Sequence, residues 1–277
     1  MAGAGRNFTQ LAEANVLPCD ARIRFDERKH EYKVDGKQVS TSVTAILKRI
    51  SAEEPFDGDF IIRKNLASWR RNPNSKYGNA VSGKSDREAA AYIKKQWSDA
   101  NRLGTKLHKR LEGLLNGEHS VADGETDVEW PALTIAIDDL MQLGAQPFRT
   151  ELSLFWERAD AVIAAGQVDV LMRHEKDDGT YEYIMVDLKR TDKAIHCDMA
   201  PFGGKMCNSP MDQHPSTDFT KYSLQISMYC VMLQQRTGIT VPTGNRFILK
   251  VHPSLSTAEL IPCACFDKEA IEILNSL

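Results

Sequence analysis

Three strand-like segments that follow one another in the second half of the chain constrain the fold most strongly. They are rich in Val, Ile, Leu and aromatic residues and cover Phe148–Glu157, Val162–Arg173 and Tyr181–Leu188. The residues Lys176-Asp177-Asp178-Gly179 between the last two are typical of a tight turn. The pattern therefore predicts three consecutive strands, with the last two joined as a hairpin.

Helical periodicity prevails before this region, and helices and strands alternate after it. A small sheet is expected over Arg22–Asp26, Glu31–Val34 and Lys37–Ser40. Helices are expected over Val43–Ile50 (capped by Ser or Thr), Gly58–Arg71, Ser85–Asn116 (interrupted or bent near Gly104), Val128–Leu143, Phe219–Arg236 and from Asp267. Loops are expected over Asn72–Gly83 and Gly117–Asp127, and further strands over Arg246–Val251 and Ala258–Phe266.

This order of elements predicts an α/β fold in which a mixed central β-sheet is flanked by helices and an N-terminal helical lobe is attached. We expect residues 1–127 to hold the small sheet and the lobe and residues 128–277 to hold the core, integrated as one domain. The segment Asp192–Ser216, with its prolines and glycines, is long for a plain connection, and we expect it to cover part of a functional site.

Composition excludes several classes of protein. With 277 residues, 42% hydrophobic and 26% charged, the chain resembles ordinary soluble globular proteins. No apolar run reaches the ~20 residues that span a bilayer, and Met1–Arg22 lacks the pattern of a secretory signal. We therefore expect an intracellular protein with no membrane partner and with its six cysteines reduced; the compartment (cytoplasm, nucleus, mitochondrion or viral factory) and protein partners stay open.

The net charge of −3 hides a strong asymmetry. Residues 61–110 carry thirteen Lys or Arg against three acids, a net charge of +10, so the rest of the chain is strongly acidic. The aromatic residues interleaved in this basic segment are Trp69, Tyr77, Tyr92 and Trp97. Positive charge with aromatic surfaces suits a polyphosphate backbone and unstacked bases, although a solvated helix face gives the same pattern.

The predicted hairpin brings two carboxylates together. If its turn is centred on Asp178, Asp169 lies opposite Asp187, and Lys189 follows on the same face. Two bare carboxylates at that distance repel, and burying them is costly, whereas a divalent cation such as Mg²⁺ resolves the conflict. The Leu188 carbonyl could complete the ligand set, and Lys189 could orient or deprotonate an attacking water. The alternative is an exposed hairpin with solvated side chains, since a register slip of one residue separates the carboxylates.

These residues resemble a known family. Asp169 followed by Asp187-x-Lys189 resembles the PD-(D/E)XK nuclease superfamily, and further elements resemble its RecB-like exonuclease branch, including viral and mitochondrial genome maintenance-type exonucleases. The further elements are Gly104-Thr105-x-x-His108, Glu151 before the hairpin, Gln225-x-x-x-Tyr229 and Ser42-Val43-Thr44. In order and spacing they span Thr41–Val251, nearly the whole chain.

The resemblance implies a restriction-endonuclease-like core and a metal-dependent DNA exonuclease, of the kind used in DNA repair, recombination and replication. It implies that Asp169, Asp187, His108 and Glu151 bind Mg²⁺, or Mn²⁺ as a substitute, that Lys189 is catalytic, and that Gln225 and Tyr229 support the site or contact DNA. No iron–sulfur cluster is expected, because the four-cysteine pattern of some members is missing. We expect DNA, single-stranded or with free ends, to contact Arg70, Arg71, Lys94, Lys95, Lys106, Arg190, Thr191 and Tyr222.

The same residues also fit less specific roles. His108 could be a core histidine packed with Leu111 and Leu115, and Glu151 a surface acid. The whole chain could be a catalytically silent nucleic-acid-binding module with the same fold. Two weaker metal patterns are a His196-x-Asp198…His252 triad of non-haem iron oxygenases and a structural metal at His196, Cys197, Cys207 and His214.

Overall fold

The computed structural model describes residues 9–52, 56–118, 122–200 and 204–277. The chain divides into two compact units, one of residues 1–53 and 108–277 and the other of residues 54–107. We call them the sheet unit and the helical unit. The long helix α5 (Asp86–Leu115) belongs to both, because the boundary falls between Leu107 and His108. The division expected from the sequence, into residues 1–127 and residues 128–277, stays a prediction.

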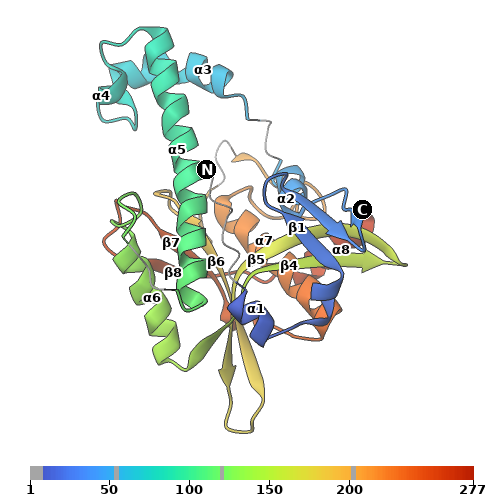
Figure 1. Ribbon diagram of the computed structural model, residues 1–277. Helices are drawn as coiled ribbons and strands as arrows, with labels where there is room; N and C mark the ends of the chain where they lie inside the picture. The colour runs from blue at the N-terminus through green and yellow to red at the C-terminus, as the bar shows by residue number, and fades with distance from the viewer. Residues whose placement is uncertain (1–8, 53–55, 119–121, 201–203) are drawn as a thin grey trace. The chain divides into compact units, whose positions relative to one another are not determined.

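The sheet unit is an α/β structure built on a five-stranded mixed sheet (Figure 1). Its strands, in spatial order, are β4 (Ala145–Arg158), β5 (Ala161–Glu175), β6 (Tyr181–Arg190), β7 (Arg246–Val251) and β8 (Glu259–Pro262). Neighbours are antiparallel except β6 and β7, which are parallel because α7 (Asp218–Thr237) lies between them in the chain. The expected fold class is confirmed.

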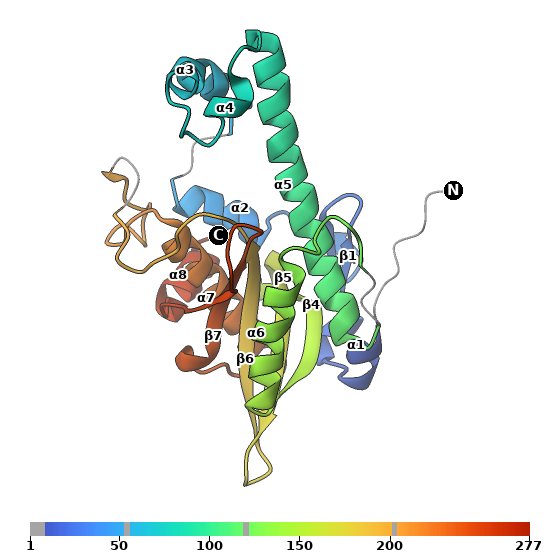
Figure 2. The same cartoon turned by 90° about the vertical axis from the view of Figure 1, so that its left-hand side faces the viewer.

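Helices cover both faces of this sheet (Figure 2). Successive side chains of β6 point to opposite faces of the central sheet, so Lys189 lies on one face and Arg190 on the other. The ammonium of Lys189 lies 4.9 Å from the ring centre of Tyr222 on α7, whereas Arg190 pairs with Glu129, the residue before α6 (Trp130–Gln142). The interior runs of β5 and β6 are largely buried, as expected for strands covered on both sides.

A second, three-stranded sheet consists of β1 (Ile23–Asp26), β2 (Glu31–Val34) and β3 (Lys37–Gln38), all antiparallel. It is followed by α2 (Val43–Ile50), whose N-cap is Ser42: the side-chain oxygen accepts a hydrogen bond from the Ala45 amide. Within the described residues, this unit also contains α1 (Gln10–Ala14), the 3₁₀ turns Pro18–Ala21 and Thr243–Asn245, and α8 (Asp267–Ser276).

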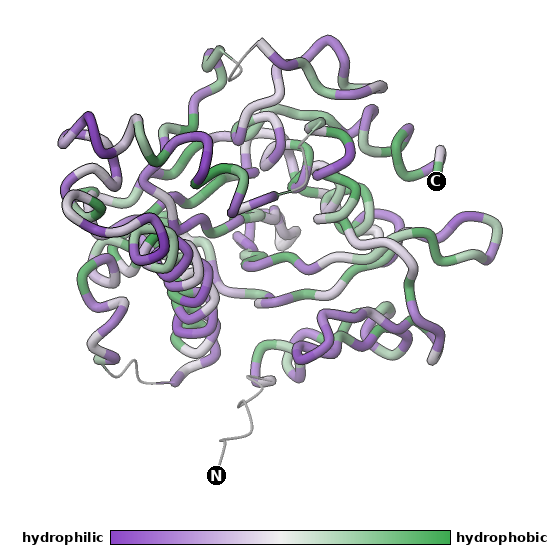
Figure 3. The backbone as a smooth tube through the Cα atoms, turned by 90° about the horizontal axis from the view of Figure 1, so that it is seen from above, coloured by the Kyte–Doolittle hydropathy of each residue, from purple (hydrophilic) through white to green (hydrophobic). Residues whose placement is uncertain are grey.

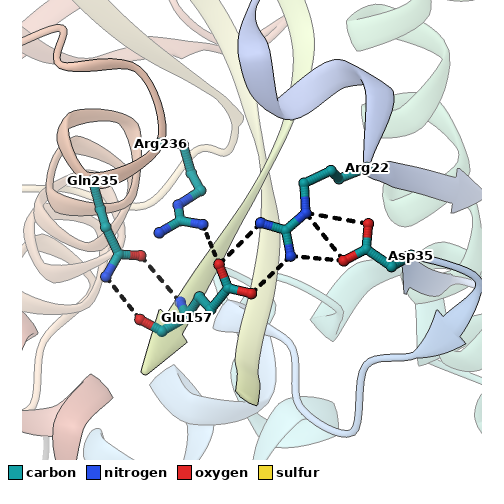
Figure 4. A network of polar contacts seen from close by, with 5 residues as sticks. All are labelled: Arg22, Asp35, Glu157, Gln235 and Arg236. Carbon is teal, nitrogen blue, oxygen red and sulfur yellow. Dashed lines mark hydrogen bonds and ion pairs between the residues drawn. The ribbon is translucent and has the colours of Figure 1, made fainter. Parts of the chain in front are cut away.

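A polar network ties the small sheet to the central sheet and to α7 (Figure 4). Glu157 near the end of β4 accepts hydrogen bonds from Arg22 and Arg236, and Arg22 also pairs with Asp35. Gln235 adds two bonds to the Glu157 backbone: its amide donates to the carbonyl at 2.8 Å, and its oxygen accepts from the amide nitrogen at 3.0 Å. Elements distant in sequence are thus joined at one carboxylate.

The helical unit is formed by α3 (Gly58–Arg71), α4 (Gly78–Val81) and the first part of α5. The aromatic residues of the basic segment pack against its small apolar core of Ile62, Leu66, Val81, Ala89 and Ile93. Trp97 donates a hydrogen bond to the Tyr77 hydroxyl at 2.7 Å, and Trp69 makes an edge contact with the same ring. These side chains are partly buried, a structural role that the interleaved pattern alone does not reveal.

Several boundaries differ from the sequence-based expectations. Helix α5 continues through Gly104, where an interruption or a bend was expected, and is not interrupted there, because a single glycine weakens a helix without ending it. The loop expected over 72–83 contains α4, and the strand expected over 258–266 is shorter, with β8 ending at Pro262. Parts of the expected loops, residues 119–121 and 201–203, lie outside the described residues, as do residues 1–8 and 53–55.

Hydrophilic and hydrophobic stretches alternate along the helices (Figure 3), as expected for helices with one buried face. Within the described residues, no helix combines the length and the apolar character needed to cross a membrane.

Candidate metal centre

The β5–β6 hairpin has the register that the turn at Asp178 predicts. Val170 lies opposite Val186, and Glu175 lies opposite Tyr181. Asp169 and Asp187 come directly beyond the last pair, where the two strands stop exchanging ladder bonds. The amide of Leu188 donates instead to the carboxylate Oδ2 of Asp169 at 2.8 Å, which holds that side chain at the end of the ladder. The expected role of the Leu188 carbonyl stays a prediction.

Three side chains from three elements meet beside this hairpin. His108 on α5, Glu151 on β4 and Asp169 on β5 each place a ligand atom within 4.8 Å of the others. The His108 Nδ1 lies 3.5 Å from Asp169 Oδ2 and 3.8 Å from Glu151 Oε1. Among the residues that the structure describes, no other cluster of three or more histidine, cysteine or acidic side chains meets this criterion.

Asp187 lies next to this cluster but outside the 4.8 Å set. Its side chain is only 3% exposed, and the Lys189 ammonium lies 2.6 Å from its Oδ2. Neither carboxylate oxygen accepts a well-aligned hydrogen bond from the described part of the chain. The Lys189 ammonium is a partner for Oδ2, but the buried Oδ1 has no hydrogen-bond donor among the described residues, so Asp187 retains capacity for a further cationic partner.

The pKa of each group in the cluster depends on the charges of its neighbours. Burial alone would lower the pKa of His108, but the Asp169 and Glu151 carboxylates raise this pKa to about 10. Burial opposes ionisation of Asp169, yet His108, Lys189 and the Leu188 amide together lower its pKa. The imidazolium therefore occupies the position in which a cation best stabilises these acids.

The other two acids of the site are harder to ionise. Burial raises the pKa of Asp187, to about 6, despite the opposing effect of Lys189, and burial also raises the pKa of Glu151. Burial would lower the pKa of Lys189, but Asp187 and Asp169 raise it, so the ammonium stays charged. Three carboxylates thus share a small volume with an imidazole and one ammonium.

The donor set fits a divalent cation. Carboxylate oxygens are the ligands that Mg²⁺ and Mn²⁺ prefer, and an imidazole nitrogen suits transition metals. The unpartnered Oδ1 of Asp187 and the close approach of His108, Glu151 and Asp169, all among the described residues, are the structural observations that support this fit.

Gln225 and Tyr229 share one face of α7, as their spacing predicts. The Gln225 amide donates to the Tyr229 hydroxyl at 3.1 Å, and Tyr229 is 4% exposed. Burial and the nearby Asp187 carboxylate raise the pKa of Tyr229 well above its usual value. Gly166 permits this packing, because a Cβ there would lie 2.6 Å from the Tyr229 ring. The pair therefore lies against the hairpin; a contact with DNA stays a prediction.

Two further residues face the site and were not expected there. Glu112 lies one helical turn after His108, and burial together with Glu151 raises its pKa to about 7. Tyr32 on β2 is half-buried, and burial followed by Glu151 and Asp169 raises its pKa. The i,i+4 spacing from His108 is a signal that could have indicated Glu112, whereas nothing local in the sequence indicates Tyr32.

The residues expected to contact DNA from the sheet unit have different surroundings. Arg190 is 8% exposed and forms a buried ion pair with Glu129, at 2.5 Å, an environment that suits a structural role better than a phosphate contact. Thr191 is half-buried at the end of β6, where its hydroxyl accepts a bond from the Lys193 amide. The Tyr222 ring centre lies 4.9 Å from the ammonium of Lys189 and 5.3 Å from that of Lys221.

Several basic residues of the helical unit make surface ion pairs. Arg70 pairs with Asp86, Lys94 with Asp59 and Lys95 with Asp99. Arg71 is exposed and donates to the Ala67 carbonyl, and Lys106 is half-buried. Exposed pairs of this kind contribute little to stability and do not remove the positive field of the segment. Contact with DNA stays a prediction for these five residues.

The alternative metal patterns find no support within the described residues. His196, Asp198 and His252 do not form a group with ligand atoms within 4.8 Å of one another, nor do His196, Cys197, Cys207 and His214. His196 and Asp198 are exposed, and His252 instead contacts the Ser254 hydroxyl at 2.7 Å. The short spacing pattern of a triad does not bring these side chains together in the fold.

Comparison with known proteins does not assign a function to the chain, so a function must be argued from the residues of the site. No family model matches the chain, and no curated protein matches it. Similar solved structures include SSO0001, with 13% identity and a TM-score of 0.34 over 85% of this chain and 73% of that chain. Another is a candidate exonuclease from Eubacterium rectale, with 14% identity and a TM-score of 0.36 over 85% of this chain and 76% of that chain. At these TM-scores neither likeness decides the function.

Proposed function

We propose that the chain is a metal-dependent deoxyribonuclease of the RecB-like PD-(D/E)XK type, an exonuclease that hydrolyses phosphodiester bonds at DNA ends. The observation that carries the proposal is the convergence of His108, Glu151 and Asp169 within 4.8 Å, beside the buried Asp187–Lys189 pair. Asp169, followed along the chain by Asp187 and Lys189, gives two carboxylates and an ammonium in the order in which that family has them.

His108, Glu151, Asp169 and Asp187 are the residues that would hold a Mg²⁺ or Mn²⁺ ion. A divalent ion bound there would polarise a phosphoryl oxygen and acidify a water molecule. The chain contributes a largely buried arrangement of charges prepared in advance, which strengthens each electrostatic interaction with a phosphate.

Lys189 is the residue whose role in the proposal is most specific. Its side chain is 19% exposed, its ammonium lies 2.6 Å from Asp187 Oδ2 and 4.9 Å from the Tyr222 ring centre, and it stays charged because the carboxylates raise its pKa. A fixed cation at this place would stabilise negative charge that develops on a phosphate and would orient an attacking water. Charge stabilisation thus suits Lys189 better than proton abstraction.

DNA is proposed as the substrate because of the basic segment, whose net charge of +10 suits a phosphate backbone. Preference for single-stranded or end-containing DNA belongs to the family resemblance, as do roles in DNA repair, recombination or replication. A catalytically silent DNA-binding module is the competing function and is an outcome of the test below.

The test is a cleavage assay with end-labelled single-stranded and duplex DNA in Mg²⁺, in Mn²⁺ and in excess chelator. We expect the wild type to shorten the DNA from an end only with a divalent ion, and Asp187→Ala and Lys189→Ala to lose about 10²–10⁴-fold in rate. Glu272→Ala, which removes an exposed carboxylate on α8 outside the candidate site, is the control and should retain full rate. DNA binding without cleavage under every ionic condition would identify the silent module instead.

A further inference from the structure

Glu151 has an unusual backbone conformation for a residue inside a long strand. Its φ is 47°, in the left-handed region, which side chains other than glycine adopt at a cost of about 1–3 kcal/mol. The ladder is regular on both sides, since Thr150 lies opposite Val170 and Leu152 lies opposite Val168. The strain is therefore confined to the residue that contributes a carboxylate to the candidate metal centre.

A side chain from the neighbouring strand stabilises this conformation. The amide Nε2 of Gln167 on β5 donates a hydrogen bond to the Glu151 carbonyl oxygen at 2.9 Å. Gln167 lies two residues before Asp169, opposite Ser153 in the ladder. Its side chain therefore gives the displaced carbonyl of Glu151 a hydrogen-bond partner.

A second contact fixes the residue before Glu151. The Asn116 side chain on the turn that ends α5 donates to the Thr150 hydroxyl at 2.9 Å and is itself buried. The same helix carries His108, whose Nδ1 lies 3.8 Å from the Glu151 carboxylate. Glu151 is thus held between α5 and β5, with its carboxylate directed at the imidazole.

We propose that Gln167 is a positioning residue that holds Glu151 in its left-handed conformation, so that the carboxylate stays in the metal centre. The inference rests on the proposed function, because it assigns Gln167 a role in binding a divalent ion through Glu151. Without the Gln167 amide, the backbone at Glu151 can relax toward the extended conformation of its neighbours, and the carboxylate then leaves the position next to His108 and Asp169.

The test is a double-mutant cycle on Mn²⁺ affinity, measured by calorimetry on the full chain without DNA. Gln167→Met keeps the length of the side chain but removes its donor. We expect it to weaken Mn²⁺ binding about 10-fold, as loss of a residue that orients a metal ligand does. Glu151→Ala should weaken binding at least as much, and Gln167→Met should have no further effect in the Glu151→Ala background.

Gln235→Met is the matched control. The Gln235 amide makes the same kind of bond, to the Glu157 carbonyl near the end of β4, on the same strand as Glu151 but not at the residue that supplies the carboxylate. This variant should bind Mn²⁺ within about twofold of wild type, since it leaves the Gln167 bond in place. Circular dichroism and melting temperature establish that each variant is folded, and Gln167→Leu replaces Gln167→Met if the latter does not fold.

The outcomes separate the two proposals. Wild-type affinity in Gln167→Met, or losses that multiply in the double variant, would overturn the positioning role while leaving the metal centre intact. Absence of Mn²⁺ binding by the wild type would overturn the proposed function and the positioning role together. An equal loss in Gln235→Met would show a general effect of amide bonds on β4 and would also overturn the inference.

Discussion

At the scale of single residues, the site depends on positions where ordinary local preferences are broken. Glu151 has a left-handed φ inside a strand, and Gly166 interrupts an apolar strand at the point where Tyr229 packs. Asp187 is buried with no well-aligned donor among the described residues. Such departures from the local rules are expected where function, not stability, has determined the residue.

Gly166→Ala should destabilise the fold and displace Tyr229. The new Cβ would lie 2.6 Å from the Tyr229 ring and 2.9 Å from a Val43 methyl group, and both neighbours are firmly packed. We expect the free energy of unfolding in urea to fall by about 1–3 kcal/mol. Gly244→Ala is the control, because a Cβ there would have no atom within 4 Å and its φ is not positive. Equal stability of the two variants would contradict this account of the packing.

Part of the site can be predicted from the sequence, because it depends on residues that lie close together along the chain. The hairpin register follows from the turn Lys176–Gly179, so Asp169, Asp187 and Lys189 could be placed together from the sequence alone. The burial of Arg190 could not be predicted, because its partner Glu129 lies 61 residues away. The bond from Gln167 to Glu151 is hidden for a related reason: it depends on a backbone conformation that the sequence gives no sign of.

At the scale of elements, the strands of the central sheet and most helices could be predicted from periodicity, and the short elements could not. The small helices Gln10–Ala14 and Gly78–Val81 lack a full amphipathic repeat, so only tertiary packing determines them. The packing of the aromatic residues of the basic segment was hidden for a similar reason: composition shows that they are present but not which side they face.

The Glu157 network predicts how stability depends on pH. The guanidinium groups of Arg22 and Arg236 lower the pKa of Glu157 from 4.5 to about 2. A lowered pKa means that the ionised carboxylate stabilises the folded state fully above about pH 4.5, and that this stabilisation disappears as the pH falls toward about 2.

Glu157→Gln should therefore lower the free energy of unfolding by about 1–2 kcal/mol at about pH 7, a value reduced for the partial exposure of Arg22. The difference from wild type should shrink below about pH 4.5 and vanish near about pH 2. Urea titrations at intervals from neutral pH down to this limit measure it. A difference that stays constant over the range would contradict the assigned role of the carboxylate.

At the scale of the whole molecule, charge is distributed unevenly along the chain. The basic segment lies mainly in the helical unit, and the acidic cluster lies in the sheet unit. In the proposed function, residues of one unit would attract the polyanion and residues of the other would carry out the hydrolysis. The surface ion pairs of Arg70, Lys94 and Lys95 reduce the local field without cancelling it.

Replacing Arg70, Arg71, Lys94 and Lys95 by glutamate should raise the Kd for single-stranded DNA at least about tenfold at about 50 mM salt, because fewer counterions are released on binding. The difference should narrow as salt increases, and fluorescence anisotropy measures it. A control with Lys29, Lys37, Lys176 and Lys268 replaced, four lysines of the sheet unit, makes the same change in net charge. Equal effects of the two sets would indicate a general charge effect and would contradict a binding role for the basic segment.

If the acids beside the β5–β6 hairpin bind one divalent cation next to Lys189, a crystal soaked in Mn²⁺ should show that ion by anomalous diffraction. We expect a peak roughly 2.0–2.3 Å from carboxylate oxygens of Asp169 and of Glu151 or Asp187, with His108 contributing a nitrogen. A soaked crystal with no peak at these side chains, or with its peak at another group of residues, would contradict it.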